Sequence, residues 1–188
     1  MLTQSGIVRS YIRPSLNSTT TAAGIPLTLT LQLANTNLSC APLAGYAVYL
    51  WHCTREGTYS MYSTGLTGET FLRGVQQADA NGQLSFTTIF PGCYDGRYPH
   101  MHFEVYPSLA AATTASNAVL TSQLTFPAAT LAEVYATSEY TTSRTHMARV
   151  TLASDNVFGN DSAARQISTA TGSASAGYHA HLGVGVAA

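Results

Sequence analysis

Apolar and polar residues alternate with a period of two over several short stretches of this chain. In residues 25–33 a leucine at every second position from 27 onward is separated from the next by threonine or glutamine. A strand with one buried and one exposed face produces this pattern, because successive strand side chains point to opposite faces. Similar alternation, or aromatic and β-branched content, predicts further strands at 45–51, 83–90, 101–106, 120–126, 149–152, 166–171 and 178–186.

Turn signals separate these stretches. Residues 79–82 read Asp-Ala-Asn-Gly, and Asn-Gly favours a tight turn between strands. A Pro-Gly pair at residues 91–92 ends the strand that follows. Segments 160–165 and 172–177 lack large apolar residues, and we expect loops there.

Helical patterning is short. Residues 129–137 and 141–147 could each form one or two helical turns, and no long amphipathic stretch occurs. Many short strands separated by turns are typical of an all-β protein, and we expect a β-sandwich of mixed sheets with short helical turns. A length of 188 residues indicates a single domain spanning residues 1–188, in which residues 1–24 form an extended segment.

The chain carries unusually few charges. Charged residues make up 9% of the sequence, all eight basic residues are arginine, and the net charge is −1. A near-neutral chain lacks the basic surface that nucleic acids or anionic membranes attract, so we expect neither as a partner. No apolar run reaches the length of a membrane span.

Richness in serine and threonine with few charges favours an extracellular protein. The first residues do not resemble a signal peptide, so this expectation supposes that one is removed, and a cytoplasmic location is the alternative. Cys40, Cys53 and Cys93 allow at most one internal disulfide. A Cys53–Cys93 bridge and three buried free thiols are both open readings of these cysteines.

The strongest chemical signal is a group of two histidines and two tyrosines. His100 and His102 are two residues apart in an expected strand, so both imidazoles point to one face. Tyr59 and Tyr94 stand in loops that follow expected strands. Two imidazoles with two phenols suit a hard, highly charged cation, and ferric iron fits best, whereas zinc favours cysteine or carboxylate beside histidine.

Four blocks of sequence carry a family resemblance. They are Trp51-His-Cys-Thr-Arg-Glu-Gly-Thr-Tyr59, Phe71-Leu-Arg-Gly-Val-Gln76, Ala80-Asn-Gly-Gln-Leu-Ser-Phe-Thr-Thr-Ile-Phe-Pro-Gly-Cys-Tyr94 and Gly96-Arg-Tyr-Pro-His-Met-His102. Together they resemble the intradiol ring-cleavage dioxygenases, non-haem iron(III) enzymes that open catechols between their two hydroxyls. The resemblance extends from about Ile7 to the C-terminal strand. Thr54 is a departure, because the family usually has aspartate there, but the position is not a ligand.

The resemblance implies specific roles. Tyr59, Tyr94, His100 and His102 would bind one Fe(III), and catechols with O2 would yield cis,cis-muconic acids. Tyr94 would leave the metal and take up a proton. Arg97 would stabilise negative charge on the ring, and Gln123 would hydrogen-bond beside the site.

The resemblance also bears on the oligomeric state. Many relatives dimerise through an N-terminal helical region, and the first twenty-five residues here show no such helix. We therefore do not expect a helix-mediated dimer.

Other aromatic and imidazole residues have simpler explanations. A second His-x-His pair occurs at His179 and His181, but no tyrosine block accompanies it, and we expect a structural or exposed pair. Packing or pocket-wall roles are expected for Tyr62, Tyr98 and Tyr106, and no ligand role for His52 or His146. Two alternatives to an enzyme stay open: a non-catalytic metal-binding sandwich and a ligand-binding sandwich.

Overall fold

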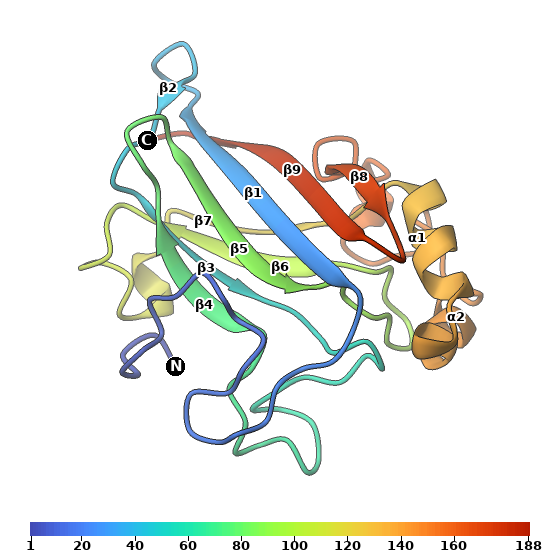
Figure 1. Ribbon diagram of the computed structural model, residues 1–188. Coiled ribbons are helices and arrows are strands. Elements are labelled where there is room, and N and C mark those ends of the chain that lie inside the picture. Colours follow the sequence, from blue (N-terminus) through green and yellow to red (C-terminus); the bar gives the residue numbers. More distant parts are fainter.

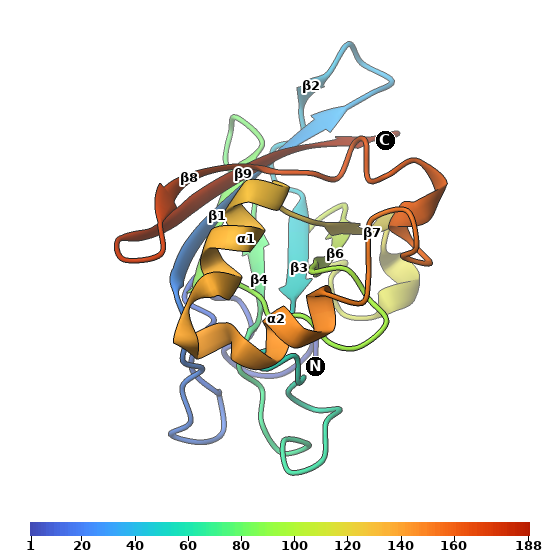
Figure 2. The ribbon, with the colours of Figure 1, turned by 90° about the vertical axis from the view of Figure 1, so that its right-hand side faces the viewer.

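The computed structural model describes all 188 residues, which form two β-sheets packed face to face with two short helices at one end (Figures 1 and 2). The strands are β1 Pro26–Asn35, β2 Ala41–Pro42, β3 Ala47–Trp51, β4 Arg73–Gln77, β5 Gln83–Ile89, β6 Met101–Tyr106, β7 Leu120–Leu124, β8 Thr169–Ser173 and β9 Gly177–Val186. The α-helices are α1 Ala128–Ala136 and α2 Thr141–Met147, and the 3₁₀ turns are Ala115–Asn117, Ser138–Tyr140 and Phe158–Asn160.

The two sheets differ in their strand directions. The five-stranded sheet has the order β2-β1-β9-β8, and β5 also pairs with β1. It is mixed, because β1 runs parallel to β9 and antiparallel to β2 and β5. The four-stranded sheet, β4-β3-β6-β7, is antiparallel throughout. The predicted all-β sandwich is confirmed.

Alternation along the strands builds the core between the sheets. Leu29 and Leu31 of β1 have no exposed surface, and they belong to the same apolar cluster as Leu50 of β3 and Phe103 of β6. Burial of each such side chain contributes roughly 1.5–3 kcal/mol to the free energy of unfolding. The polar residues of β6 therefore face the other way, toward the outer side of the four-stranded sheet.

Cross-strand register lines up three residues on that outer side. Trp51 of β3 pairs with His102 of β6, and His102 pairs with Gln123 of β7. Directly paired residues lie on the same face of a sheet. The candidate site thus rests on three neighbouring strands of the four-stranded sheet.

Two strand predictions were inaccurate. Residues 149–152 form no strand, because the chain leaves α2 into a turn and only Val150 of the four is buried. The stretch predicted at 166–171 begins as a strand only at Thr169, since Gln166 and Ser168 instead bond to the backbone of Thr125. The loop expected at 172–177 is shorter, because its ends belong to β8 and β9.

The remaining expectations correspond to observed elements. Helices α1 and α2 coincide within one residue with the two predicted helical segments, and a turn occupies residues 80–81. No helix lies within residues 1–24. None of the helices is long and apolar enough to span a membrane. All three cysteines are free thiols, with Cys40 exposed and Cys53 and Cys93 buried.

Candidate metal centre

The two predicted histidine ligands face one another. His102 lies in β6, and His100 lies just before the strand begins, so both share the outer face of the sheet. Their Nε2 atoms are 3.0 Å apart, and their ring planes are inclined by 86°. The two imidazoles therefore converge on one point with the same nitrogen.

Hydrogen bonding fixes the tautomer of His100. Its Nδ1 atom lies 2.6 Å from the carbonyl oxygen of Tyr98, which can only accept, so Nδ1 carries the proton. The lone pair is then on Nε2, which faces His102. Burial lowers the pKa of His100 to about 4 and that of His102 to about 3, the latter helped by His100 itself. Both imidazoles are neutral at pH 7, the state that binds metals.

Tyr94 joins the histidines from the loop after β5. Its hydroxyl lies 3.1 Å from Nε2 of His100. The loop is anchored at Cys93, whose N–H donates to Oγ of Ser143 and whose carbonyl accepts from Nδ1 of His146. Helix α2 carries both anchors, so it holds the Tyr94 loop in place.

Tyr59 supplies a buried hydroxyl without a partner. Its hydroxyl oxygen is inaccessible to solvent and makes no hydrogen bond. Its ring centroid is 5.6 Å from that of Tyr94 and 6.1 Å from that of His102. A buried polar atom without a partner is costly, and such an atom beside a convergent donor set indicates a missing ligand.

A glycine brings the two tyrosine loops together. Gly57 has a φ of +89°, and a Cβ atom there would lie 2.6 Å from the carbonyl oxygen of Cys93. Any larger residue would therefore push the loop of Tyr59 away from the loop of Tyr94.

The four side chains fit a ferric ion. No group of three or more histidine, cysteine, aspartate and glutamate side chains is placed to hold a metal, so a metal here depends on the phenols. Burial raises the pKa of both Tyr59 and Tyr94. Only a strong local positive charge would make these phenols anionic, and a trivalent cation provides it. Two neutral imidazoles and two phenols are the donor set that a hard cation prefers.

Arg97 and Gln123 form a single polar group beside the histidines. Arg97 donates from Nη2 to Oε1 of Gln123 at 2.6 Å and from Nε to Asp155 at 2.9 Å. Burial alone would raise the pKa of Asp155, but its bonds from Arg97 and three backbone N–H groups outweigh this and lower it to about 2. Asp155 was missed in the sequence, where nothing in its surroundings distinguishes it.

Trp51 was also missed as a site residue. It stands directly opposite His102 in the β3–β6 pairing, and its indole packs against that imidazole. A strand at 45–51 was predicted, but only the cross-strand register places its last residue against a ligand.

The other candidates contribute no donor atom to this group, although the ring centroid of Tyr62 lies 6.2 Å from that of Tyr59. His179 and His181 are exposed on the outer face of β9, as expected for a pair without tyrosines. His52 is buried and bonds to Thr88. Tyr62 is 66% exposed at the rim, whereas the hydroxyl of Tyr106 donates to Glu104.

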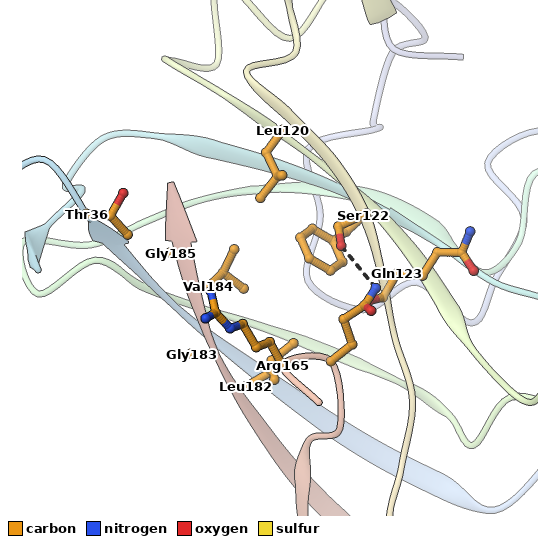
Figure 3. A pocket seen from close by; sticks show the side chains of 11 residues that line it. Thr36, Leu120, Ser122, Gln123, Arg165, Leu182, Gly183, Val184 and Gly185 are labelled. Atoms are coloured by element: carbon orange, nitrogen blue, oxygen red, sulfur yellow. Dashed lines mark hydrogen bonds between the residues drawn. The ribbon is translucent and has the colours of Figure 1, made fainter. Parts of the chain in front are cut away.

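A separate cleft lies between the sheets. Its volume is about 500 Å³. Figure 3 shows that Leu120 and Ser122 of β7 and Leu182 and Val184 of β9 line it. Gln123 lines this cleft, but none of the four predicted ligands does. The convergent histidine–tyrosine group is therefore a different site from the largest cavity.

Comparisons with known proteins place the chain in a family. A family model described as Dioxygenase matches residues 12–132. The fold matches the intradiol ring-cleavage dioxygenase from Tetranychus urticae with a TM-score of 0.77 and 28% identity, covering 97% of this chain and 88% of that one. A stretch of 57 residues is 33% identical to chlorocatechol 1,2-dioxygenase of Rhodococcus opacus, covering 30% of this chain and 22% of that enzyme, so most of that relative lies outside the match.

Two more distant structures share the fold. The dioxygenase domain of a dioxygenase–carbohydrate-binding fusion protein from Streptomyces sp. SirexAA-E matches with a TM-score of 0.63 and 21% identity, covering 95% of this chain and 87% of that chain. Catechol 1,2-dioxygenase from Pseudomonas arvilla C-1 matches with a TM-score of 0.60 and 18% identity, covering 99% of this chain and 59% of that chain. With the family model spanning most of the sandwich, the chain belongs to the intradiol ring-cleavage dioxygenases.

Proposed function

We propose that the protein is a ferric dioxygenase that cleaves catechols between their two hydroxyls. Both atoms of O2 enter the product, a cis,cis-muconic acid. The observation that carries the proposal is the meeting of Nε2 of His100, Nε2 of His102 and the Tyr94 hydroxyl, beside the partnerless hydroxyl of Tyr59. The names of the matched enzymes, which include a chlorocatechol and a catechol 1,2-dioxygenase, support the same substrate class.

The four side chains would hold the iron. A ferric ion bound by them would act as a Lewis acid and template for the two catechol oxygens and would make the ring reactive toward O2. His100 is held in the correct tautomer by the Tyr98 carbonyl, and the proton on Nδ1 directs the lone pair of Nε2 inward.

Tyr94 would serve as the proton acceptor. Its hydroxyl oxygen lies within hydrogen-bond reach of the histidine pair, and its loop is partly exposed. A catechol that binds through both oxygens must lose two protons. The Tyr94 oxygen, a phenolate when the ferric ion is bound, would take one of them, and the other would pass to solvent. Tyr59, buried at its hydroxyl, would remain in place.

Arg97 would stabilise negative charge on the bound ring. Its Nε and one N–H of Nη2 are occupied by Asp155 and Gln123, which fix the guanidinium plane. The remaining N–H groups are free to donate to an anionic oxygen. Gln123 would act through Arg97 by fixing its orientation.

The test combines spectroscopy with oxygen uptake. Protein purified without metal is loaded with ferric iron, and its metal content, visible spectrum and O2 consumption with catechol are measured. Two phenolates on ferric iron give a red-brown colour, and catechol should shift the absorption and yield a muconic acid. A colourless protein that takes up no iron would overturn the proposal. Iron and colour without O2 uptake would instead favour a non-catalytic metal-binding sandwich.

A further inference from the structure

Arg73 is a fully buried cation that the proposed reaction does not use. Only 1% of its surface is exposed, and no carboxylate lies within ion-pair distance of its guanidinium. Burying a charge without an opposite charge is unfavourable unless hydrogen bonds replace the lost water. The partners that Arg73 does have therefore indicate what it is for.

Most of these partners belong to the turn of residues 59–63, here called the Tyr59 turn, which is closed by the hydrogen bond from the Ser63 N–H to the Tyr59 carbonyl. Arg73 donates from Nε to Oγ of Ser60 at 2.9 Å and from Nη2 to the Ser60 carbonyl at 2.8 Å. The guanidinium also lies 4.6 Å from the centre of the Tyr62 ring. The remaining contact is a donation from Nη1 to the hydroxyl of Tyr49 on β3 at 2.9 Å. The planar guanidinium of Arg73 thus joins the Tyr59 turn to the four-stranded sheet.

The turn needs such support. Met61 has a φ of +68°, in the left-handed region that residues other than glycine rarely adopt. Non-glycine residues remain there only when surrounding contacts hold them. Ser60 and Tyr62, the residues on either side of Met61, are the ones that Arg73 contacts.

We propose that Arg73 is a positioning residue that clamps this turn and so directs the Tyr59 hydroxyl at the histidine pair. The metal-ligand role of Tyr59 rests on the proposed function. The clamp itself is a property of the metal-free chain, because every contact that forms it is between protein groups. Lysine could not replace it, since a single ammonium group lacks the planar fork that reaches both sides.

The variants are chosen to separate positioning from general stability. Arg73→Lys keeps the charge and loses the planar guanidinium, and Arg73→Met loses both. Ser60→Ala keeps the Ser60 carbonyl that accepts from Nη2, but it removes the hydroxyl that accepts from Nε and donates to the Phe71 carbonyl. Arg9→Met is the matched control. Arg9 is a half-buried arginine that donates to the carbonyls of Pro14, Thr70 and Arg73, and it does not touch the Tyr59 turn.

The first measurement is amide hydrogen exchange in the metal-free protein. The Ser63 N–H donates to the Tyr59 carbonyl, so its exchange reports the closed turn. Loss of charge-assisted hydrogen bonds should speed Ser63 exchange roughly 10- to 100-fold in Arg73→Lys, with a smaller rise in Ser60→Ala. Arg9→Met should leave it unchanged. An unchanged Ser63 exchange rate in Arg73→Lys, or an equal increase of that rate in Arg9→Met, would overturn the proposal. Arg73→Lys is sufficient for this decision even if Arg73→Met does not fold.

The second measurement uses the iron-loaded protein. Resonance Raman excitation into the tyrosinate absorption identifies the Tyr59 contribution as the bands that Tyr59→Phe removes. Arg73→Lys should lose or weaken those bands while the Tyr94 bands persist, and Arg9→Met should keep both. Full Tyr59 bands in Arg73→Lys would count against positioning. If the unmodified protein takes up no iron, the proposed function fails, while the exchange result still decides whether Arg73 clamps the turn.

Discussion

Trp51 lies flat against His102, with ring centroids 4.8 Å apart and ring planes 5° apart. Tyr49 also stacks on the indole, with ring centroids 5.0 Å apart. The only hydrogen-bond contact of the His102 side chain is through Nε2, the atom that faces His100. The orientation of this imidazole therefore depends on stacking, in contrast to His100, which the Tyr98 carbonyl holds.

Removing the indole should weaken metal binding. A partner that orients a metal-binding histidine is typically worth about 10- to 100-fold in metal affinity. We expect Trp51→Ala to lower iron affinity by that order and Trp51→Phe to retain most of it, measured by competition with a chelator. His181→Ala, which removes an exposed ring from β9 of the five-stranded sheet, is the control. Equal affinity in Trp51→Ala and the unmodified protein would show that stacking does not orient His102.

Each of the two histidines should be required for iron. His100→Ala and His102→Ala remove one nitrogen of the donor set and should abolish the colour and most of the bound iron, as read by metal analysis and visible absorption. His179→Ala, from the exposed second His-x-His pair, should keep both. If either variant retained its full iron content, the assignment of that histidine as an iron ligand would be wrong.

Arg97 and Gln123 should affect turnover without affecting iron. Neither is a predicted ligand, and the two are bonded to each other at 2.6 Å. Loss of one preorganised donor commonly costs about 10²–10³ in kcat. The kcat of Arg97→Met should decrease by that factor, while its colour stays intact. The kcat of Gln123→Leu should decrease less, because Gln123 acts through Arg97. Unchanged kinetics in Arg97→Met would place the side chain outside the reaction.

The sequence pattern predicted the shared face of the two histidines better than it predicted their surroundings. Spacing was sufficient to place His100 and His102 on one face, because a period of two fixes which strand residues share a face. Trp51 and Gln123 reach the site only through the register of three strands, and a single sequence does not encode register directly. The local pattern therefore predicted which side chains share a face but not which residues oppose them.

The errors in the fold have a similar origin. Residues 149–152 contain two β-branched side chains, Val150 and Thr151, yet the chain there is still turning out of α2. Strand β4 was not predicted, because Arg73-Gly-Val-Gln-Gln77 shows no alternation. Its first residue is buried by contacts with a distant turn rather than by apolar packing. Tertiary contacts override local propensity at these positions.

The site should accept a range of catechols. The lining of a cleft of about 330 Å³ includes Trp51, which stacks on His102, and Tyr62, whose ring centroid is 6.2 Å from that of Tyr59. Tyr62 is 66% exposed, so this side of the donor group is open to solvent. Apolar contacts discriminate by only roughly 1–3 kcal/mol per methylene-sized difference. We expect catechol, a methylcatechol, protocatechuate and pyrogallol to have comparable kcat/KM values. A single substrate favoured by several orders of magnitude would reveal a selective contact in this cleft.

Acid should destabilise the metal-free protein partly through His52. This histidine joins the two sheets: Nδ1 donates to the Cys53 carbonyl at 2.8 Å, and Nε2 accepts from the Thr88 hydroxyl at 2.7 Å. Burial lowers its pKa from 6.5 to about 4. Between pH 6.5 and pH 4 the imidazole is therefore protonated in the unfolded chain but neutral in the folded protein. The contribution of neutral His52 to the free energy of unfolding is complete above pH 6.5 and is lost as the pH falls toward 4.

The loss attributable to His52 should amount to about 2 kcal/mol between pH 7 and pH 5. Urea unfolding at the two pH values measures it, and His52→Gln supplies the comparison, because its amide oxygen can accept from Thr88 but does not titrate. His100 and His102 also have lowered pKa values, but both residues are present in both proteins. Their contributions to the acid-induced loss of stability therefore cancel when the two proteins are compared. His52→Gln should be less stable at pH 7 and less sensitive to acid. An equal loss of stability in the two proteins would mean that His52 does not resist protonation in the fold.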